Sequence, residues 1–430
     1  MSNFQEIRNR AQELRKQKKY SEALPLYKDL WENCEPKDKW DGWGFALCLN
    51  SLKDYKTAYK VSKRVYEIDP SFDYNKGQFA WSSYMANVKD YPDDNSTDTL
   101  ENYVSEIIKI TEGKEHELFR NQAILKVMDH LSNKNSWGRV IEWSNFINPE
   151  FLDTKPFDAV TSDGKKFRKP SDKESYYLKL SKALERLEKF QECIDICDNA
   201  LKSFPDEIWF KWHKGSCLRK LKQFNESIKL LEEIKKLKKD WFILKELSAA
   251  YYGNKDYENA YKNFIESAVI QIRIPESQNR WELFYIGAMI LYKMNNIQVA
   301  DKHVALCYKL RDENQWKIPD FIQRDINTRK ISLTKSSAEL FNELKDFWIR
   351  EQQNFLPKQI GSIKNFIQDG KAGFIKGDNG KDYYFRVNNF LGNNSSLKLN
   401  IKVQFNIQKS FDKKKNREAE EAINIILIKN

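Results

Sequence analysis

The sequence predicts a mainly α-helical protein in which an array of helical hairpins is followed by a small all-β domain. Three observations support this prediction. Large, mostly aromatic residues recur at intervals of 33 to 35 residues, most of them followed three positions later by a small residue. The 430 residues include only 15 glycines and 11 prolines, which favours long regular elements over loops. After Pro357 the apolar residues change from helical spacing to alternation, which is typical of strands.

The recurring large residues, which we call anchors, define the helical array. Phe190, Phe224 and Tyr257 are 34 and 33 residues apart. The small residue three positions after each of them allows two helices to approach closely, while the large residues fill the groove between neighbouring hairpins. Stacked hairpins of this kind bury one continuous core and leave a concave surface. The other anchors are Tyr20, Tyr55, Trp137 and Ile297.

These anchors resemble those of the tetratricopeptide repeat (TPR), a helix–turn–helix unit of about 34 residues. The resemblance covers roughly residues 4–311. It implies a TPR-like α-solenoid that binds a protein or peptide partner in its concave groove. Residues on the first helix of each hairpin would line that groove, among them Asn50, Lys211 and Lys214.

The same pattern predicts the domain boundaries. We expect helical repeats in residues 1–149, where they are partly degenerate, and again in residues 171–311. Residues 150–170 are rich in Pro, Gly and Asp, and we interpret them as an inserted loop. Residues 312–356 lack the repeat spacing and are expected to form capping helices and a linker. Residues 357–430 are expected to form the all-β domain.

Five short strands are predicted downstream of Pro357. The residues Asp-Asn-Gly-Lys between the second and third strands are typical of a hairpin turn. Five strands in so short a segment favour a small barrel of the OB kind. The predicted strands are residues 361–366, 372–377, 382–387, 402–407 and 422–428.

Three short motifs in these strands resemble the cold-shock domain. G-S-I-K-N-F from Gly361 is similar to the family's G-x-V-K-W-F, and G-K-A-G-F-I from Gly370 is similar to its K-G-F-G-F-I. Y-Y-F-R from Tyr383 is similar to its V-F-V-H. The resemblance covers about residues 358–430. It implies a five-stranded cold-shock-like barrel that binds single-stranded RNA or DNA by stacking bases on an outer platform of aromatic rings.

The platform is expected on one face of two strands, because residues two apart on a strand share a face. By the family's pattern this face carries Ala372 and Phe374 on one strand and Tyr384 and Arg386 on the next. Flanking lysines would contact phosphates. The predicted nucleic-acid-binding residues are Lys364, Phe366, Lys371, Phe374, Lys376, Lys381, Tyr384 and Arg386. The residues expected to point into the core are Gly373, Ile375, Tyr383, Phe385 and Val387.

This sequence departs from the family at three platform positions. Asn365 stands where the family has tryptophan, Ala372 where it has phenylalanine, and Arg386 where it has histidine. An arginine can still stack its guanidinium plane or pair with phosphate. The reduced aromatic area leaves two functions open. The protein is either a nucleic-acid-binding adaptor whose solenoid recruits a protein, or a protein–protein scaffold whose barrel is only structural.

Positive charge is concentrated in the predicted barrel. Residues 357–430 contain 14 Lys and Arg against 7 Asp and Glu, whereas the rest of the chain contains 59 against 55. Such a concentration suggests a polyanionic partner, and an ordinary solvated face is the alternative. The segment from Phe411 to Glu420 is predicted to be a basic loop that either grips a nucleic-acid backbone or is simply solvated.

No residues indicate catalysis, a cofactor or a metal. The six cysteines are scattered without a C-x-x-C pair, which is typical of free thiols in a reducing cytoplasm. Cys193 and Cys197 are four residues apart, but both occupy repeat positions, so we interpret them as core thiols. The N-terminal segment is charged from Glu6 onward, and no apolar run is long enough to span a bilayer. We therefore expect a cytoplasmic protein that is not an enzyme and does not contact a membrane.

Overall fold

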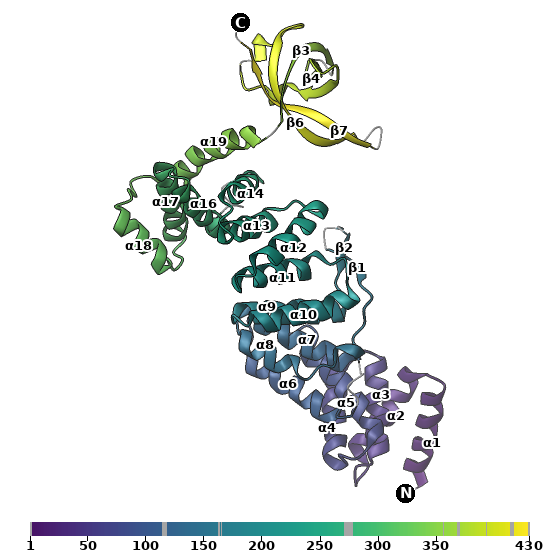
Figure 1. The fold of residues 1–430 in the computed structure, drawn as a ribbon. Helices are drawn as coiled ribbons and strands as arrows, with labels where there is room; N and C mark the ends of the chain where they lie inside the picture. The colour runs from purple at the N-terminus through teal and green to yellow at the C-terminus, as the bar shows by residue number, and fades with distance from the viewer. Residues whose placement is uncertain are drawn as a thin grey trace. The chain divides into compact units, whose positions relative to one another are not determined.

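The structure is a computed structural model that describes residues 2–113, 118–161, 164, 166–270, 278–355, 357–367, 370–392, 394–412 and 417–428. It divides into two compact units, Met1–Leu221 and Lys222–Asn430, which we call unit 1 and unit 2. Helices and one short β-hairpin make up unit 1. Helices also make up the first part of unit 2, and the strands at its end are yellow-green to yellow in Figure 1.

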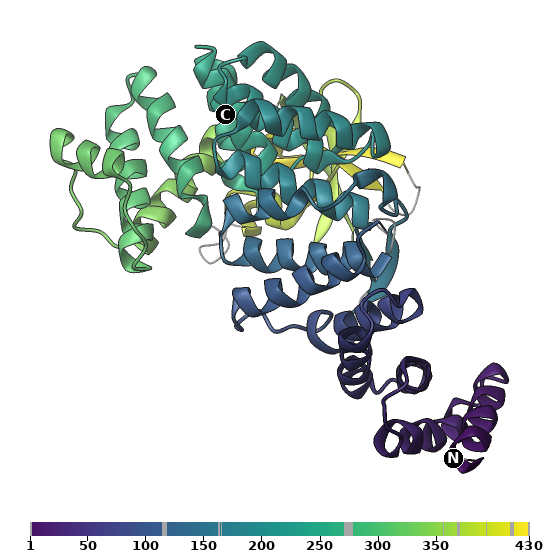
Figure 2. The same ribbon diagram turned by 90° about the horizontal axis from the view of Figure 1, so that it is seen from below.

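Unit 1 is an array of antiparallel helices in which each helix packs against the next, as two views show (Figures 1 and 2). A π-helical turn, Tyr84–Val88, extends α5. The helices are α1 (Ser2–Lys16), α2 (Tyr20–Asn33), α3 (Lys39–Ser51), α4 (Tyr55–Ile68), α5 (Asp73–Ser83), α6 (Thr97–Ile110), α7 (Leu118–Asn133), α8 (Trp137–Ser144), α9 (Asp172–Arg186), α10 (Phe190–Ser203) and α11 (Ile208–Lys220).

Unit 2 contains further helices of the same kind, followed by a closed β-barrel. Its helices are α12 (Phe224–Leu237), α13 (Trp241–Gly253), α14 (Tyr257–Val269), α16 (Trp281–Lys293), α17 (Ile297–Glu313), α18 (Asp320–Arg329) and α19 (Ser337–Phe355). Its strands are β3 (Lys358–Ile367), β4 (Ala372–Gly377), β5 (Asp382–Arg386), β6 (Lys402–Asp412) and β7 (Arg417–Leu427). The predicted mainly α fold, a TPR-like array with a five-stranded barrel at its end, is confirmed.

Each anchor residue is the first residue of a helix, and a left-handed residue lies two positions before it. Lys18, Lys53 and Lys255 are examples, with φ of 59°, 67° and 63°. The amide of the residue that follows donates to the carbonyl five positions back, as Asp54 does to Leu49 O at 2.9 Å. This bond satisfies a carbonyl that the end of the first helix leaves free, and it turns the chain back on itself. A left-handed residue likewise lies two positions before Trp137, Phe190, Phe224 and Ile297.

The small residues of the repeat are buried, whereas the large anchors lie at the edge of the core. The residues three positions after the anchors are all 0% exposed. The aromatic anchors are half-buried, and the side chain of Ile297 is 42% exposed. Close contacts between neighbouring hairpins also involve glycine. A Cβ at Gly44 of α3 would lie 2.4 Å from the ring of Tyr27 in α2. Those at Gly253 and Gly287 would lie 2.3 and 2.2 Å from the rings of Phe224 and Phe264.

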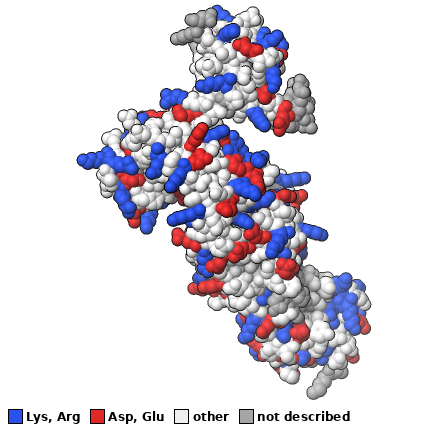
Figure 3. All heavy atoms as spheres, viewed as in Figure 1, with Lys and Arg blue, Asp and Glu red and all other residues white. Residues whose placement is uncertain are grey.

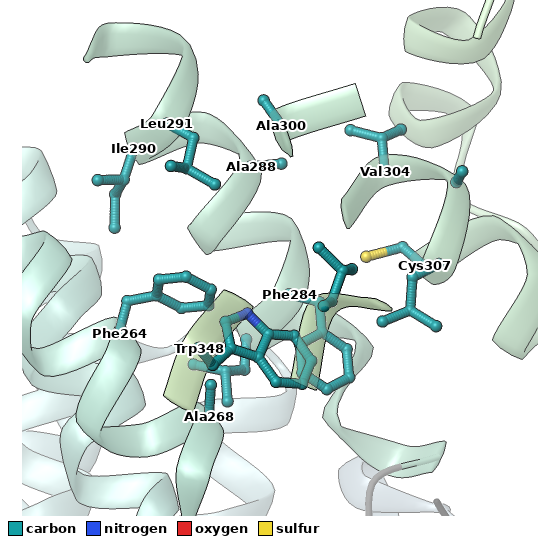
Figure 4. Close-up of a cluster of buried hydrophobic side chains, with 14 of the residues drawn as sticks. Phe264, Ala268, Phe284, Ala288, Ile290, Leu291, Ala300, Val304, Cys307 and Trp348 are labelled. Atoms are coloured by element: carbon teal, nitrogen blue, oxygen red, sulfur yellow. The ribbon is translucent and has the colours of Figure 1, made fainter. Parts of the chain in front are cut away.

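Trp348 of α19 packs against both α16 and α17 and so joins these three helices of unit 2. Its fully buried ring stacks on Phe284 of α16, with ring centroids 5.1 Å apart and an interplanar angle of 5° (Figure 4). Its indole Nε1–H donates to Nε2 of His303 in α17 at 2.8 Å. Nδ1 of His303 in turn donates to Val299 O at 2.7 Å, so both ring nitrogens of the neutral imidazole are satisfied.

The barrel closes in the order β3–β4–β5–β7–β6, with β6 paired back to β3. All pairings are antiparallel except that of β5 with β7. Its core holds residues from all five strands. Ile375, Tyr383 and Phe385 are buried there and Val387 packs against it, as the alternation predicts. Gly373 is also buried, and a Cβ on it would lie 2.3 Å from the carbonyl oxygen of Asn365.

Residues 150–170, which we expected to be a loop, contain a short antiparallel hairpin. β1 (Phe157–Val160) pairs with β2 (Lys166–Lys169). Gly164, with φ of 81°, forms the turn, and its amide donates to Thr161 O at 2.9 Å. Composition alone predicted a loop here, because most of the Pro, Gly and Asp residues flank two four-residue strands that pair with each other.

The first prediction concerns the glycine contacts. Gly287→Ala places a methyl group against the fully buried ring of Phe264, so we expect the free energy of unfolding to fall by about 1–3 kcal/mol. Urea unfolding followed by circular dichroism measures it. Gly77 of α5 has no atom within 4 Å of its Cβ position, so Gly77→Ala should be neutral or stabilising by up to about 1 kcal/mol. Equal destabilisation by both substitutions would contradict this explanation.

The second prediction concerns pH. Burial lowers the pKa of His303 from 6.5 to about 4, so the folded protein binds this proton more weakly than the unfolded chain does. The stabilisation by the neutral ring is complete above pH 6.5 and is lost as the pH falls towards 4, by about 3 kcal/mol in all. His303→Gln keeps an acceptor for Trp348 and does not titrate. Urea unfolding from pH 7.5 to 4.5 should therefore show a flatter pH dependence for the variant, and parallel curves would refute the assignment.

Candidate nucleic-acid interface

Two predicted platform residues form one aromatic pair on the outside of the barrel. Phe374 of β4 and Tyr384 of β5 are directly opposite each other in the strand register. Their ring centroids are 5.8 Å apart at an interplanar angle of 70°. Both side chains are half-buried, whereas their neighbours Ile375 and Tyr383 are buried in the core. The alternation of the two strands thus places this pair on the outer face, next to the register pair of Ala372 and Arg386.

The first strand contributes less to this face than its sequence suggests. A bulge interrupts the β3–β4 register between Ile363 and Asn365, so Lys364 and Asn365 are both exposed. Asn365 lies opposite Phe374 in the register. The ring of Phe366 packs against the core, 6.0 Å from the ring of Phe385 at 71°, and is half-buried. The exposed position where the family has tryptophan therefore lies beside the aromatic pair and carries an amide.

Ala372 is 1% exposed, although it lies on the same face as Phe374. It offers no surface on which a base can stack. The aromatic surface on these strands therefore consists of the Phe374–Tyr384 pair and the edge of Phe366.

Carboxylates pair with three of the five predicted cations. Lys364 forms an ion pair with Asp382, and Lys381 lies 3.9 Å from Glu420. The Nε of Arg386 lies 3.4 Å from an oxygen of Glu421, on the strand beside Tyr384. Blue and red side chains are accordingly mixed on the visible face of the barrel in Figure 3.

Lys371 and Lys376 differ from the other predicted cations. Among the acidic residues that the structure describes, none lies within ion-pair distance of either lysine. Lys376 is exposed on β4, and Lys371 is exposed just before β4 begins. These two lysines are the cations of the predicted set that remain available to a phosphate.

A cleft of about 770 Å³ lies beside the aromatic pair. The sequence argument did not include the two asparagines and the leucine that follow β5 and line part of this cleft. The only signal for them was the polar run Val-Asn-Asn after β5 and the Asn-Asn-Ser-Ser run beyond it. The lining residues are Phe366, Gly370, Lys371, Tyr384, Arg386, Val387, Asn388, Asn394 and Leu397.

The predicted basic loop from Phe411 to Glu420 is only partly described. β6 runs to Asp412 and β7 begins at Arg417, so these strands are longer than predicted. Residues 413–416, which hold its three consecutive lysines, lie outside the described residues. Glu418 and Glu420 of β7 are paired in the strand register with Phe411 and Lys409 of β6.

The residues predicted to line the helical groove are partly engaged within unit 1. Asn50 is buried, and its Nδ2 donates to Gln78 Oε1 at 2.7 Å. Nζ of Lys214 lies 2.5 Å from Asp198. Lys211 is half-buried. Asn50 therefore joins two helices and does not line a groove.

Cys193 and Cys197 are fully buried core residues. A hydrogen bond with Cys197 and, to a smaller extent, burial raise the pKa of the Cys193 thiol. Because the thiolate is the form that binds a metal, a thiol that keeps its proton is a poor metal ligand. No group of three or more His, Cys, Asp or Glu side chains that would hold a metal occurs in the described part of the chain. Within the same residues, no helix is long and apolar enough to cross a membrane.

No protein-family model and no curated protein matches this chain. Solved helical-repeat structures match it at low identity. A human IFIT1 dimer with m7Gppp-AAAA is 13% identical, with a TM-score of 0.36 over 80% of each chain. MamA from Desulfovibrio magneticus RS-1 is 15% identical, with a TM-score of 0.33 over 45% of this chain and 96% of that one. A tetratricopeptide repeat protein from Parabacteroides merdae is 10% identical, with a TM-score of 0.34 over 72% and 98%. At these values none of the similarities says what this protein binds.

Proposed function

We propose that this protein is a nucleic-acid-binding adaptor without catalytic activity. Its barrel binds single-stranded RNA or DNA, and its helical array binds a protein partner. The strand order of the barrel and the three sequence motifs support an OB-type, cold-shock-like domain, a class that binds oligonucleotides on its outer strands.

The observation that carries the proposal is the Phe374–Tyr384 pair. Two rings in edge-to-face contact on adjacent strands are held in place by the strand register and by each other. The two side chains therefore lose little conformational freedom when a base stacks on them. Lys371 lines the adjacent cleft, where it is placed to contact the backbone of a bound strand. Bases must be unpaired to stack in this way, so single strands are the expected ligand.

The ion pairs favour a second candidate, the scaffold with a structural barrel. Asp382, Glu420 and Glu421 compensate three cations that the resemblance assigned to phosphate binding. Nucleic-acid affinity depends strongly on uncompensated cations. We therefore expect modest affinity, with stacking contributing a large share of it.

The third prediction tests the aromatic pair. Phe374→Ala and Tyr384→Ala should each weaken binding of a labelled single-stranded oligonucleotide by about 1–3 kcal/mol and leave its salt dependence nearly unchanged, because no charge is lost. Lys371→Ala should weaken binding and lower the salt slope by about 1. Fluorescence anisotropy of the full chain at several salt concentrations measures both effects.

Matched controls come from elsewhere on the barrel. Leu399 is 56% exposed and Lys402 is exposed, and neither lines the cleft, so Leu399→Ala and Lys402→Ala should change affinity little. Unaltered affinity in both aromatic variants, with the fold intact, would favour the scaffold.

The fourth prediction is a gain of binding. Asn365 is exposed opposite Phe374, where the family has tryptophan. Asn365→Trp should add one stacking surface and strengthen oligonucleotide binding by about 1–3 kcal/mol. Leu399→Trp adds the same ring elsewhere on the barrel and should not. An equal gain in both variants would indicate non-specific stacking on any exposed ring.

A further inference from the structure

Four aromatic side chains of unit 1 form a cluster where α3 and α5 begin. Trp40 and Trp43 lie one turn apart on α3, Phe72 directly precedes α5, and Tyr74 lies in its first turn. The ring centroid of Trp40 is 4.7 Å from that of Phe72, 5.3 Å from that of Tyr74 and 5.9 Å from that of Trp43. We call these four residues the α3–α5 aromatic cluster.

The cluster exposes large apolar surface that is nevertheless held in place. Trp40 is 43% exposed and Tyr74 is 64% exposed. Below them, the guanidinium of Arg15 lies 4.6 Å from the ring centroid of Trp43, and the ammonium of Lys39 lies 5.0 Å from that of Phe72. Rings fixed in this way lose little freedom when a partner binds, and exposed Trp and Tyr residues are the types that dominate binding at protein interfaces.

The charges around the cluster are largely compensated by local partners. Lys39 pairs with Asp69 at 2.7 Å, and Arg8 pairs with the buried Asp41 at 2.6 Å. On α5, Lys76 lies 3.2 Å from Asp73. Arg15 differs, because the group to which its guanidinium donates, the hydroxyl of Tyr27 at 3.0 Å, is neutral. A polyanion would find few uncompensated cations here, so the complementary partner is one with little charge.

We infer that the α3–α5 aromatic cluster is the docking site for an extended, proline-rich segment of the partner protein. This inference rests on the proposed adaptor function and names the class of segment that the helical array binds. Proline-rich segments adopt a preformed extended helix, and they are recognised by aromatic side chains that pack against the proline rings. Such recognition needs little charge and few directional bonds, which matches a surface made mainly of the exposed rings of Trp40 and Tyr74, supported by the buried ring of Phe72.

The test uses the full chain and a library of immobilised peptides that carry Pro-x-x-Pro with all other positions varied. A second library replaces the prolines with alanine. Trp209 is the matched control, because it is the second residue of α11 as Trp40 is the second residue of α3. It is 42% exposed, and its ring lies 5.9 Å from that of Trp212. The variants are Trp40→Ala, Tyr74→Ala, Trp40→Phe and Trp209→Ala, each checked for helix content by circular dichroism.

We expect peptides with proline to be retained over their alanine counterparts. Trp40→Ala and Tyr74→Ala should each weaken retention at least about tenfold, while Trp40→Phe should keep most of it and Trp209→Ala nearly all. Oligonucleotide binding, measured on the same samples, should be unchanged in all four variants. The proposed function assigns this binding to the barrel, so its absence in every sample would count against the barrel's proposed role and not against this docking site.

Three results would overturn the inference. One is retention that does not depend on proline. Another is an equal loss in Trp40→Ala and Trp209→Ala, which would mean that any exposed tryptophan binds these peptides. The third is a fall in oligonucleotide affinity on removal of Trp40 with no effect on peptides, which would make the cluster a stacking surface for nucleic acid.

Discussion

The helical array depends on the close approach of neighbouring hairpins at positions that have almost no side chain. The ring of Tyr27 occupies the place where a side chain of Gly44 would be, and the ring of Phe264 does the same at Gly287. A single hairpin cannot bury its apolar face alone, so these contacts between hairpins supply the core that each one lacks. The left-handed turns contribute to the same packing, because each reverses the chain within three residues and so brings the two helices of a hairpin side by side.

In the barrel, the alternation of side chains along the strands produces both the core and the outer face. Ile375 and Phe385 point inwards because Phe374 and Tyr384 point outwards, so neither set can change without the other. Closure through the parallel pairing of β5 with β7 brings Glu421 beside Tyr384. The same pairing that completes the core thus places a carboxylate at the edge of the aromatic pair, within 3.4 Å of Arg386.

The features that the sequence predicted correctly are those that depend on the spacing of residues within one helix or strand. Every anchor residue begins a helix, and all five predicted strands are present, because both rest on contacts within a few residues. The charge count, by contrast, overestimated the cations available to a phosphate. Arg386 and Glu421 are far apart in the sequence, and only the strand register brings them together. The α3–α5 aromatic cluster was missed for the same reason, since Trp40 and Phe72 belong to different hairpins.

The two described sheets of this protein differ in whether they have free strand edges. The barrel closes on itself and leaves no free strand edge among the strands that the structure describes, whereas the β1–β2 hairpin pairs with no other described strand and keeps two. Its side chains include Phe157, Val160 and Phe167, all about half exposed or more. An open edge beside such residues is a template on which a second molecule can add a strand. Arg168 of β2 is paired with Glu174, but Lys166 and Lys169 oppose that association by repulsion between copies. Because salt screens this repulsion, association through this edge should become easier as the ionic strength rises.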